Sequence, residues 1–180
     1  MKKTLLLLSA PVIMLFAKCG SGTGDGNDEN DSVQVVDLGT IADMDLSKYG
    51  YPLIVNVPAP SPNTPEATVD VLDWGGIEIR VGTNFQIQIS GGEGDVAQKK
   101  SDIQNEDINE STFLIDEADA IFYRSKVKGT EIAPEYHFFV VKKDGNKYFE
   151  IEDIKGEVYE ESAAKRMFDI ARAIKIKPTA

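Results

Sequence analysis

The chain of 180 residues has only one cysteine, one histidine and one tryptophan, and these scarcities exclude several kinds of protein. A single cysteine cannot form a disulfide within the chain, so the fold must depend on its hydrophobic core. A single histidine, His137, excludes a zinc site with two histidine ligands. The longest apolar run is also too short for a membrane-spanning helix, which needs about 20 residues.

Basic residues are scarce as well: 19 lysines and arginines stand against 30 aspartates and glutamates, and the formal net charge is −11. Three of the lysines precede Cys19, so a chain beginning at Cys19 would carry 16 (19 minus 3) basic residues against 30 acidic ones, a net charge of −14. Such a surface repels nucleic-acid phosphates and anionic lipid headgroups. We therefore expect no nucleic-acid partner, and we expect any membrane attachment to use lipid.

The first residues have the pattern of an export signal. Lys2 and Lys3 are followed by the apolar run from Leu5 to Ala17, which contains no charge. As a helix this run is about 20 Å long, which is too short to span a bilayer but typical of a signal-peptide core. The only cysteine of the chain follows immediately, in the sequence Phe16-Ala17-Lys18-Cys19-Gly20.

This arrangement resembles the lipobox of bacterial lipoproteins. Lys18 stands where a small residue is usual, as in the relaxed lipoboxes of Bacteroidetes-like bacteria. The resemblance implies that residues 1–18 are a signal peptide and that Cys19 becomes the lipidated first residue of the mature protein. It also implies a lipid-anchored protein of the cell envelope, at the outer membrane of a Gram-negative bacterium. Cleavage after Ala17, which would leave a free thiol, and an uncleaved anchor are the alternatives.

Residues 20–32 predict a flexible acidic tether behind the lipidated cysteine. The sequence GSGTGDGNDENDS contains no apolar side chain that could offset the entropy of ordering it. Asp25, Asn27 and Glu29 have the spacing of calcium-loop ligands. However, Asn30 replaces the turn glycine and Val36 replaces the distal glutamate. A solvated spacer is therefore the better interpretation, and residues 33–180 are expected to form one globular domain.

Alternating apolar residues predict two β-hairpins in that domain. In the first, a loop at Gly82-Thr83-Asn84 places Val81 opposite Phe85, so that six apolar side chains share one face. The second joins residues 136–142 to residues 147–152 through a turn at Asp144-Gly145. This second register pairs Val140 with Phe149 and Phe138 with Ile151, and it places His137 opposite Glu152.

Helical signals complete an α+β fold class. One helix is expected from Val96 to about Glu106, with Asp95 as its N-cap, and another from Ser162 to about Lys175. Further strands are expected near residues 33–36, 51–57, 112–115 and 120–127, with a proline-rich loop over residues 58–65. The domain should therefore be an antiparallel sheet of about six strands packed by two helices, the last one C-terminal. This order of elements over residues 45–176 resembles that of Mog1/PsbP-like domains.

The sequence contains no cofactor motif and no recognisable catalytic motif. Gly91-Gly92-Glu93-Gly94 lacks the lysine of a phosphate loop and carries a repelling acid. His137 and Glu152 are predicted to form a polar pair on a partly exposed sheet face, with an acid/base pair as the alternative. Trp74 stands beside Asp73 and two glycines in a turn-like setting. The carboxylates are expected to be solvated, with one weak divalent-cation site as the alternative: Asp102, Glu106, Asp107, Glu110, Asp116, Glu117, Asp119, Glu150, Glu152 and Asp153.

These observations predict an exported lipoprotein with a non-catalytic binding domain, whose partners are the membrane, through its lipid, and an envelope protein. No cofactor, metal or catalytic residue is expected. One alternative is a small envelope hydrolase that uses a carboxylate site. Another is an inhibitor or immunity-like lipoprotein that meets a basic enzyme with its acidic face. A deep pocket with converging carboxylates would favour the hydrolase, and a flat apolar face rimmed by acids would favour binding.

Overall fold

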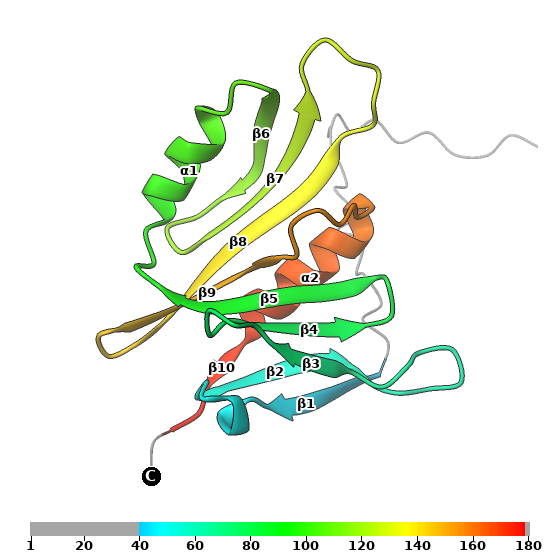
Figure 1. The fold of residues 1–180 in the computed structure, drawn as a ribbon, viewed down its shortest axis with the longest axis vertical. Helices are drawn as coiled ribbons and strands as arrows, with labels where there is room; N and C mark the ends of the chain where they lie inside the picture. Colours follow the sequence, from blue (N-terminus) through cyan, green and yellow to red (C-terminus); the bar gives the residue numbers. More distant parts are fainter. Residues whose placement is uncertain (1–39, 179–180) are drawn as a thin grey trace, which may run out of the picture. The chain divides into compact units, whose positions relative to one another are not determined.

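A computed structural model describes residues 40–178, which form an α+β domain of two antiparallel sheets and two α-helices (Figure 1). The larger sheet has seven strands in the order β3-β4-β5-β9-β8-β7-β6, and the smaller has the order β1-β2-β10. The predicted fold class is confirmed, although these residues form more strands than the six expected. The bounds are β1 Ile41–Asp45, β2 Leu53–Pro58, β3 Thr68–Val71, β4 Ile77–Val81, β5 Phe85–Gly92, α1 Val96–Gln104, β6 Asn109–Asp116, β7 Ala120–Val127, β8 Glu135–Asp144, β9 Lys147–Asp153, α2 Glu161–Ala173 and β10 Lys175–Ile176, with a 3-10 helix at Ser47–Tyr49.

The β4–β5 hairpin has the predicted register. Val81 lies opposite Phe85, Ile79 opposite Ile87, and Ile77 opposite Ile89. All six side chains are buried. Gly82 begins the loop at a φ of 60°, a left-handed conformation that glycine adopts without steric cost.

The predicted register of the β8–β9 hairpin is wrong by two residues. Val140 pairs with Ile151 rather than with Phe149, and the turn residues are Gly145 and Asn146 rather than Asp144 and Gly145. A glycine followed by asparagine also tolerates the positive φ angles of a tight hairpin, and Gly145 has a φ of 59°. Because side chains alternate with a period of two, a shift of two residues leaves the same side chains on the buried face.

Both predicted helices are present, and each ends one turn or less before its expected last residue. Asp95 caps α1 by accepting a hydrogen bond from the Gln98 backbone N–H at 2.8 Å. The helix α2 ends at Ala173, after which Lys175 and Ile176 pair with β2. Among the described residues, neither helix has the length and apolarity to cross a membrane.

The seven-stranded sheet has side chains packed against both of its faces. The helix α2 and strand β2 cover one face and enclose the main core, in which Phe168 contacts Phe122 and Phe138. On the other face, Val96 and Ile103 of α1 pack against a smaller cluster on β7 and β8. Figure 1 shows α1 lying over the end of the sheet formed by β6, β7 and β8. That helix therefore leaves part of its sheet face uncovered.

Several sequence predictions concern residues outside the described range. They are the signal peptide of residues 1–18, the lipidated Cys19, the tether of residues 20–32 and the strand near residues 33–36. Three short strands, β1, β3 and β10, had not been predicted. Each lies at the edge of its sheet, where it pairs with only one other strand, so fewer packing contacts constrain its sequence.

Candidate functional site

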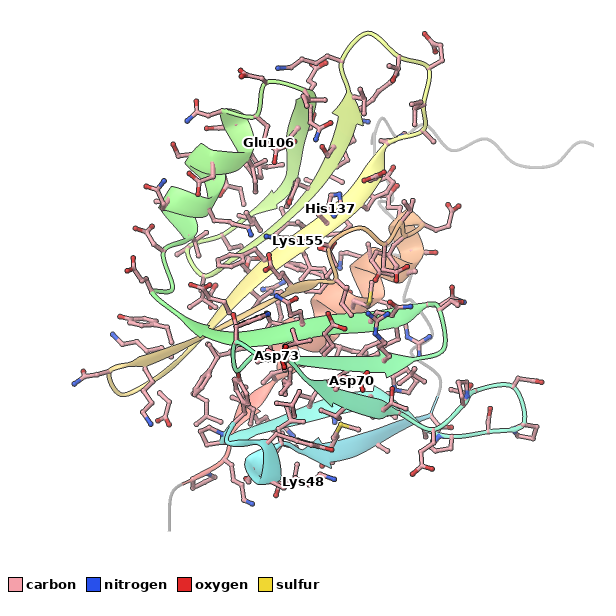
Figure 2. The ribbon with its side chains drawn as sticks, viewed as in Figure 1. Lys48, Asp70, Asp73, Glu106, His137 and Lys155 are labelled. Carbon is pink, nitrogen blue, oxygen red and sulfur yellow. The ribbon has the colours of Figure 1, made fainter. Side chains whose placement is uncertain are left out.

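A cleft of about 360 Å³ lies beside α1, over the sheet face that this helix leaves partly uncovered. Its walls come from α1 and the segment after it, from β6, β7, β8 and β9, and from the loop that follows β9. Figure 2 labels three of its residues, Glu106, His137 and Lys155, which come from three different parts of the chain. The cleft is lined by Lys99, Asp102, Ile103, Glu106, Asn109, Tyr123, Ser125, Glu135, His137, Glu152, Asp153, Lys155 and Gly156.

His137 lies in this cleft between two carboxylates. Its Nδ1 is 2.7 Å from Oδ2 of Asp153, and its Nε2 is 3.6 Å from Oε2 of Glu135. The side chain of His137 is 19% exposed, and its ring packs against Tyr123 with the centroids 5.4 Å apart. With a carboxylate facing each nitrogen, the arrangement suits the doubly protonated imidazolium, which has two N–H donors.

Asp153 is itself held in place, because it completes the backbone hydrogen bonding of β8. It can therefore fix the orientation of His137. The β8–β9 ladder stops at the pair Phe139–Glu152, and Oδ1 of Asp153 then accepts a hydrogen bond from the Phe138 N–H at 2.9 Å. One carboxylate therefore bonds both a backbone donor and the imidazole. The side chain of Asp153 is only 6% exposed, so removing it would leave a buried donor without an acceptor.

The electrostatics of the site favour a charged histidine. Burial by itself lowers the pKa of His137, but the hydrogen bond to Asp153 and the charges of Asp153 and Glu135 outweigh burial. The pKa therefore lies above the ordinary value of 6.5. Burial and the same negative surroundings raise the pKa of Tyr123, which keeps its hydroxyl protonated. The raised pKa of His137 is a consequence of the position of the two carboxylates.

The predicted His137–Glu152 pair is wrong. Both residues line the cleft, but Glu152 pairs with Nζ of Lys99 on α1 at 2.7 Å, whereas His137 pairs with Asp153. The prediction of a partly exposed polar pair fails because the register shift moves Glu152 opposite Phe139. The Lys99–Glu152 pair ties α1 to the sheet beside the cleft.

Asp153 was expected to be solvated, and this prediction is wrong, because its side chain is only 6% exposed. Glu135 was not among the acids singled out in the sequence, whereas one signal for the burial of Asp153 was present. Phe149, Ile151 and Asp153 fall at alternate positions of one strand, so the acid continues the buried face. An acid in phase with buried residues needs a buried partner, and His137 is the only histidine available. Glu135 had no comparable signal, because it stands at the beginning of β8.

The other predicted acids do not gather into a metal site. Asp102 reaches the cleft from α1 and Glu106 from the segment after it, whereas Asp116 pairs with Lys100 and Glu117 with Arg172. Within residues 40–178, no group of three or more histidine, cysteine, aspartate or glutamate side chains is arranged to hold a metal ion. The divalent-cation alternative therefore has no support in this part of the chain.

No protein-family model matches the chain, and the searches of curated proteins and of solved structures found no match either. The resemblances to bacterial lipoproteins and to Mog1/PsbP-like domains therefore stay predictions.

His137 is expected to make the free energy of unfolding depend on pH. Because the folded pKa of His137 is raised, its contribution to stability is fully present below a pH of about 6.5 and is lost as the pH rises through the folded pKa. We expect the free energy of unfolding of His137→Gln to fall less than that of the wild type between pH 6 and 8. Urea unfolding at several pH values measures both slopes, and equal slopes would contradict the assigned imidazolium.

Proposed function

We propose that the chain is an exported lipoprotein, anchored in the cell envelope through Cys19, whose described domain is a non-catalytic binding module. In this proposal the cleft around His137 holds a segment of an envelope protein. The leader pattern and the lone cysteine support the anchor. The outer membrane is the expected location, because the lipobox resembles the relaxed form of Bacteroidetes-like bacteria.

The observation that carries the binding module is the cleft itself. Its polar groups stand on strands and on a helix tied to them by the Lys99–Glu152 pair, so they are held in place before any ligand arrives. His137 is fixed by Asp153, while Asp102 of α1 and Glu106, two residues beyond the end of α1, are exposed at the edge of the cleft. A concave site with a few oriented polar groups is the usual form of a ligand site.

Site-specific photocrosslinking in intact cells tests this proposal. A benzophenone amino acid at position 102, which lines the cleft, should give a discrete adduct with an envelope protein. The matched control is position 104, which is exposed on the same helix but does not line the cleft. Adding His137→Gln to the position-102 variant should lower the yield of the adduct. Equal adducts from both positions, or none from position 102, would contradict a binding cleft.

A hydrolase is the second candidate, because the carboxylates that converge on the cleft are the feature expected of a hydrolase, and because His137 resembles an oriented general base. A buried carboxylate on Nδ1 fixes the ring, as in an oriented general base, but Nε2 faces Glu135 and the imidazole must first lose the proton that its raised pKa retains. Among the described residues, however, the hydroxyl of Ser125 bonds Ser111 at 3.3 Å and no hydroxyl donates to His137. Hydrolysis of a model ester that disappears in His137→Gln would support this candidate over the binding module.

A further inference from the structure

Trp74, the only tryptophan of the chain, lies exposed on the loop between β3 and β4. The residue is 61% exposed, although tryptophan is normally well buried. Val71, at the end of β3, is also exposed. The cleft around His137 includes neither residue, so both lie outside that site.

The indole ring is held in place by the loop beneath it. A side chain on Gly76 would overlap three carbons of the six-membered ring of Trp74, so the ring lies directly over the Gly76 backbone. Two backbone hydrogen bonds of 2.9 Å, Leu72 N–H to Gly76 O and Gly75 N–H to Leu72 O, close the turn. The hydroxyl of Tyr51 also donates to the Gly75 carbonyl at 2.7 Å. One side of the ring therefore rests on the protein, and the tryptophan is ordered without being buried.

Two carboxylates within four residues of Trp74 along the chain have no side-chain partner within residues 40–178. Asp73 precedes Trp74 in the turn, and Asp70 lies on β3 (Figure 2). Both are exposed, and among the described residues neither makes an ion pair or a side-chain hydrogen bond. Tryptophan is the aromatic side chain that binds cations best, and carboxylates pair with the same cations. The formal net charge of −11 attracts a basic partner to the whole surface.

We infer that the Trp74 turn is a docking point for a basic partner protein, which stacks an arginine guanidinium on the indole and pairs it with Asp73 or Asp70. Arginine fits better than lysine, because its planar group stacks on an aromatic face while its edge bonds a carboxylate. A preordered ring also avoids the entropy cost of fixing a side chain on binding. This inference does not depend on the cleft, so either can fail while the other holds.

Intrinsic fluorescence tests the inference directly, because Trp74 is the only tryptophan. We expect a short arginine-rich peptide to change the emission of the whole chain saturably, and the peptide with lysine in place of arginine to bind more weakly. Asp73→Asn should weaken binding of the arginine peptide about threefold, which is the effect expected from the loss of one exposed charge pair. A neutral oligosaccharide should give no change, and a saturable change with it alone would overturn the inference in favour of a sugar platform.

A charge-matched control separates docking at this turn from diffuse attraction. Asp107→Asn removes one exposed acid from the turn after α1 and leaves the Trp74 turn unchanged. It should bind the arginine peptide as tightly as the wild type at the same ionic strength. Equal weakening by Asp73→Asn and Asp107→Asn, or the absence of any saturable emission change, would overturn the inference. Thermal unfolding of both variants verifies that each is folded.

Discussion

Asp153→Ala should lower the free energy of unfolding by about 3 kcal/mol, because it removes both bonds of a buried carboxylate at once. The Phe138 N–H donates a hydrogen bond of 2.9 Å to Asp153, and without this carboxylate it would stay buried with no acceptor. His137 would keep only the longer contact to Glu135, and the end of β9 would lose its side-chain link to β8. Urea unfolding at pH 6, where the imidazolium is favoured, measures the loss.

Two further variants show whether the loss comes from this carboxylate. Glu152→Ala removes the neighbouring acid, whose bond goes to a Lys99 ammonium at the edge of the cleft, and should cost about 1 kcal/mol at most. Asp153→Asn keeps an oxygen for the Phe138 N–H but removes the charge beside His137, so its cost should be intermediate. An Asp153→Ala protein no less stable than Glu152→Ala would contradict the role assigned to the buried bonds.

Cys19→Ser should release the protein from membranes, since serine offers no thiol for lipid attachment. Each acyl chain contributes about 0.8 kcal/mol per buried CH₂, and two or three chains give a stable anchor. The excess of acidic side chains gives no electrostatic attraction to anionic headgroups that could replace the lipid. Fractionation of cells followed by a high-salt wash measures the release.

The control for this variant lies two residues away. Ser21→Ala changes the segment after the cysteine without touching the thiol, so it should leave the protein in the membrane fraction. Metabolic labelling with a palmitate analogue should mark the wild type and Ser21→Ala, but not Cys19→Ser. If Cys19→Ser still pellets with membranes after the wash, the lipoprotein proposal is wrong.

The elements of the fold could be predicted from the sequence more fully than the candidate site. The six apolar residues of the β4–β5 hairpin fixed both its face and its register, because a three-residue loop allowed only one pairing of the large side chains. Asp95 and the apolar stripe of α2 located two helices to within a few residues. The candidate site depended on contacts between β8, β9 and α1, which no local pattern describes.

The sequence by itself determined which side chains of β8 and β9 are buried, since alternation with a period of two assigns Phe138, Val140, Phe149 and Ile151 to one face in either register. For the same reason it could not distinguish registers that differ by two residues. Only the tertiary structure decided that question, because β9 also pairs with β5 and β8 with β7. Those additional pairings place Asp153 at the point where the β8–β9 ladder ends, and there it meets His137.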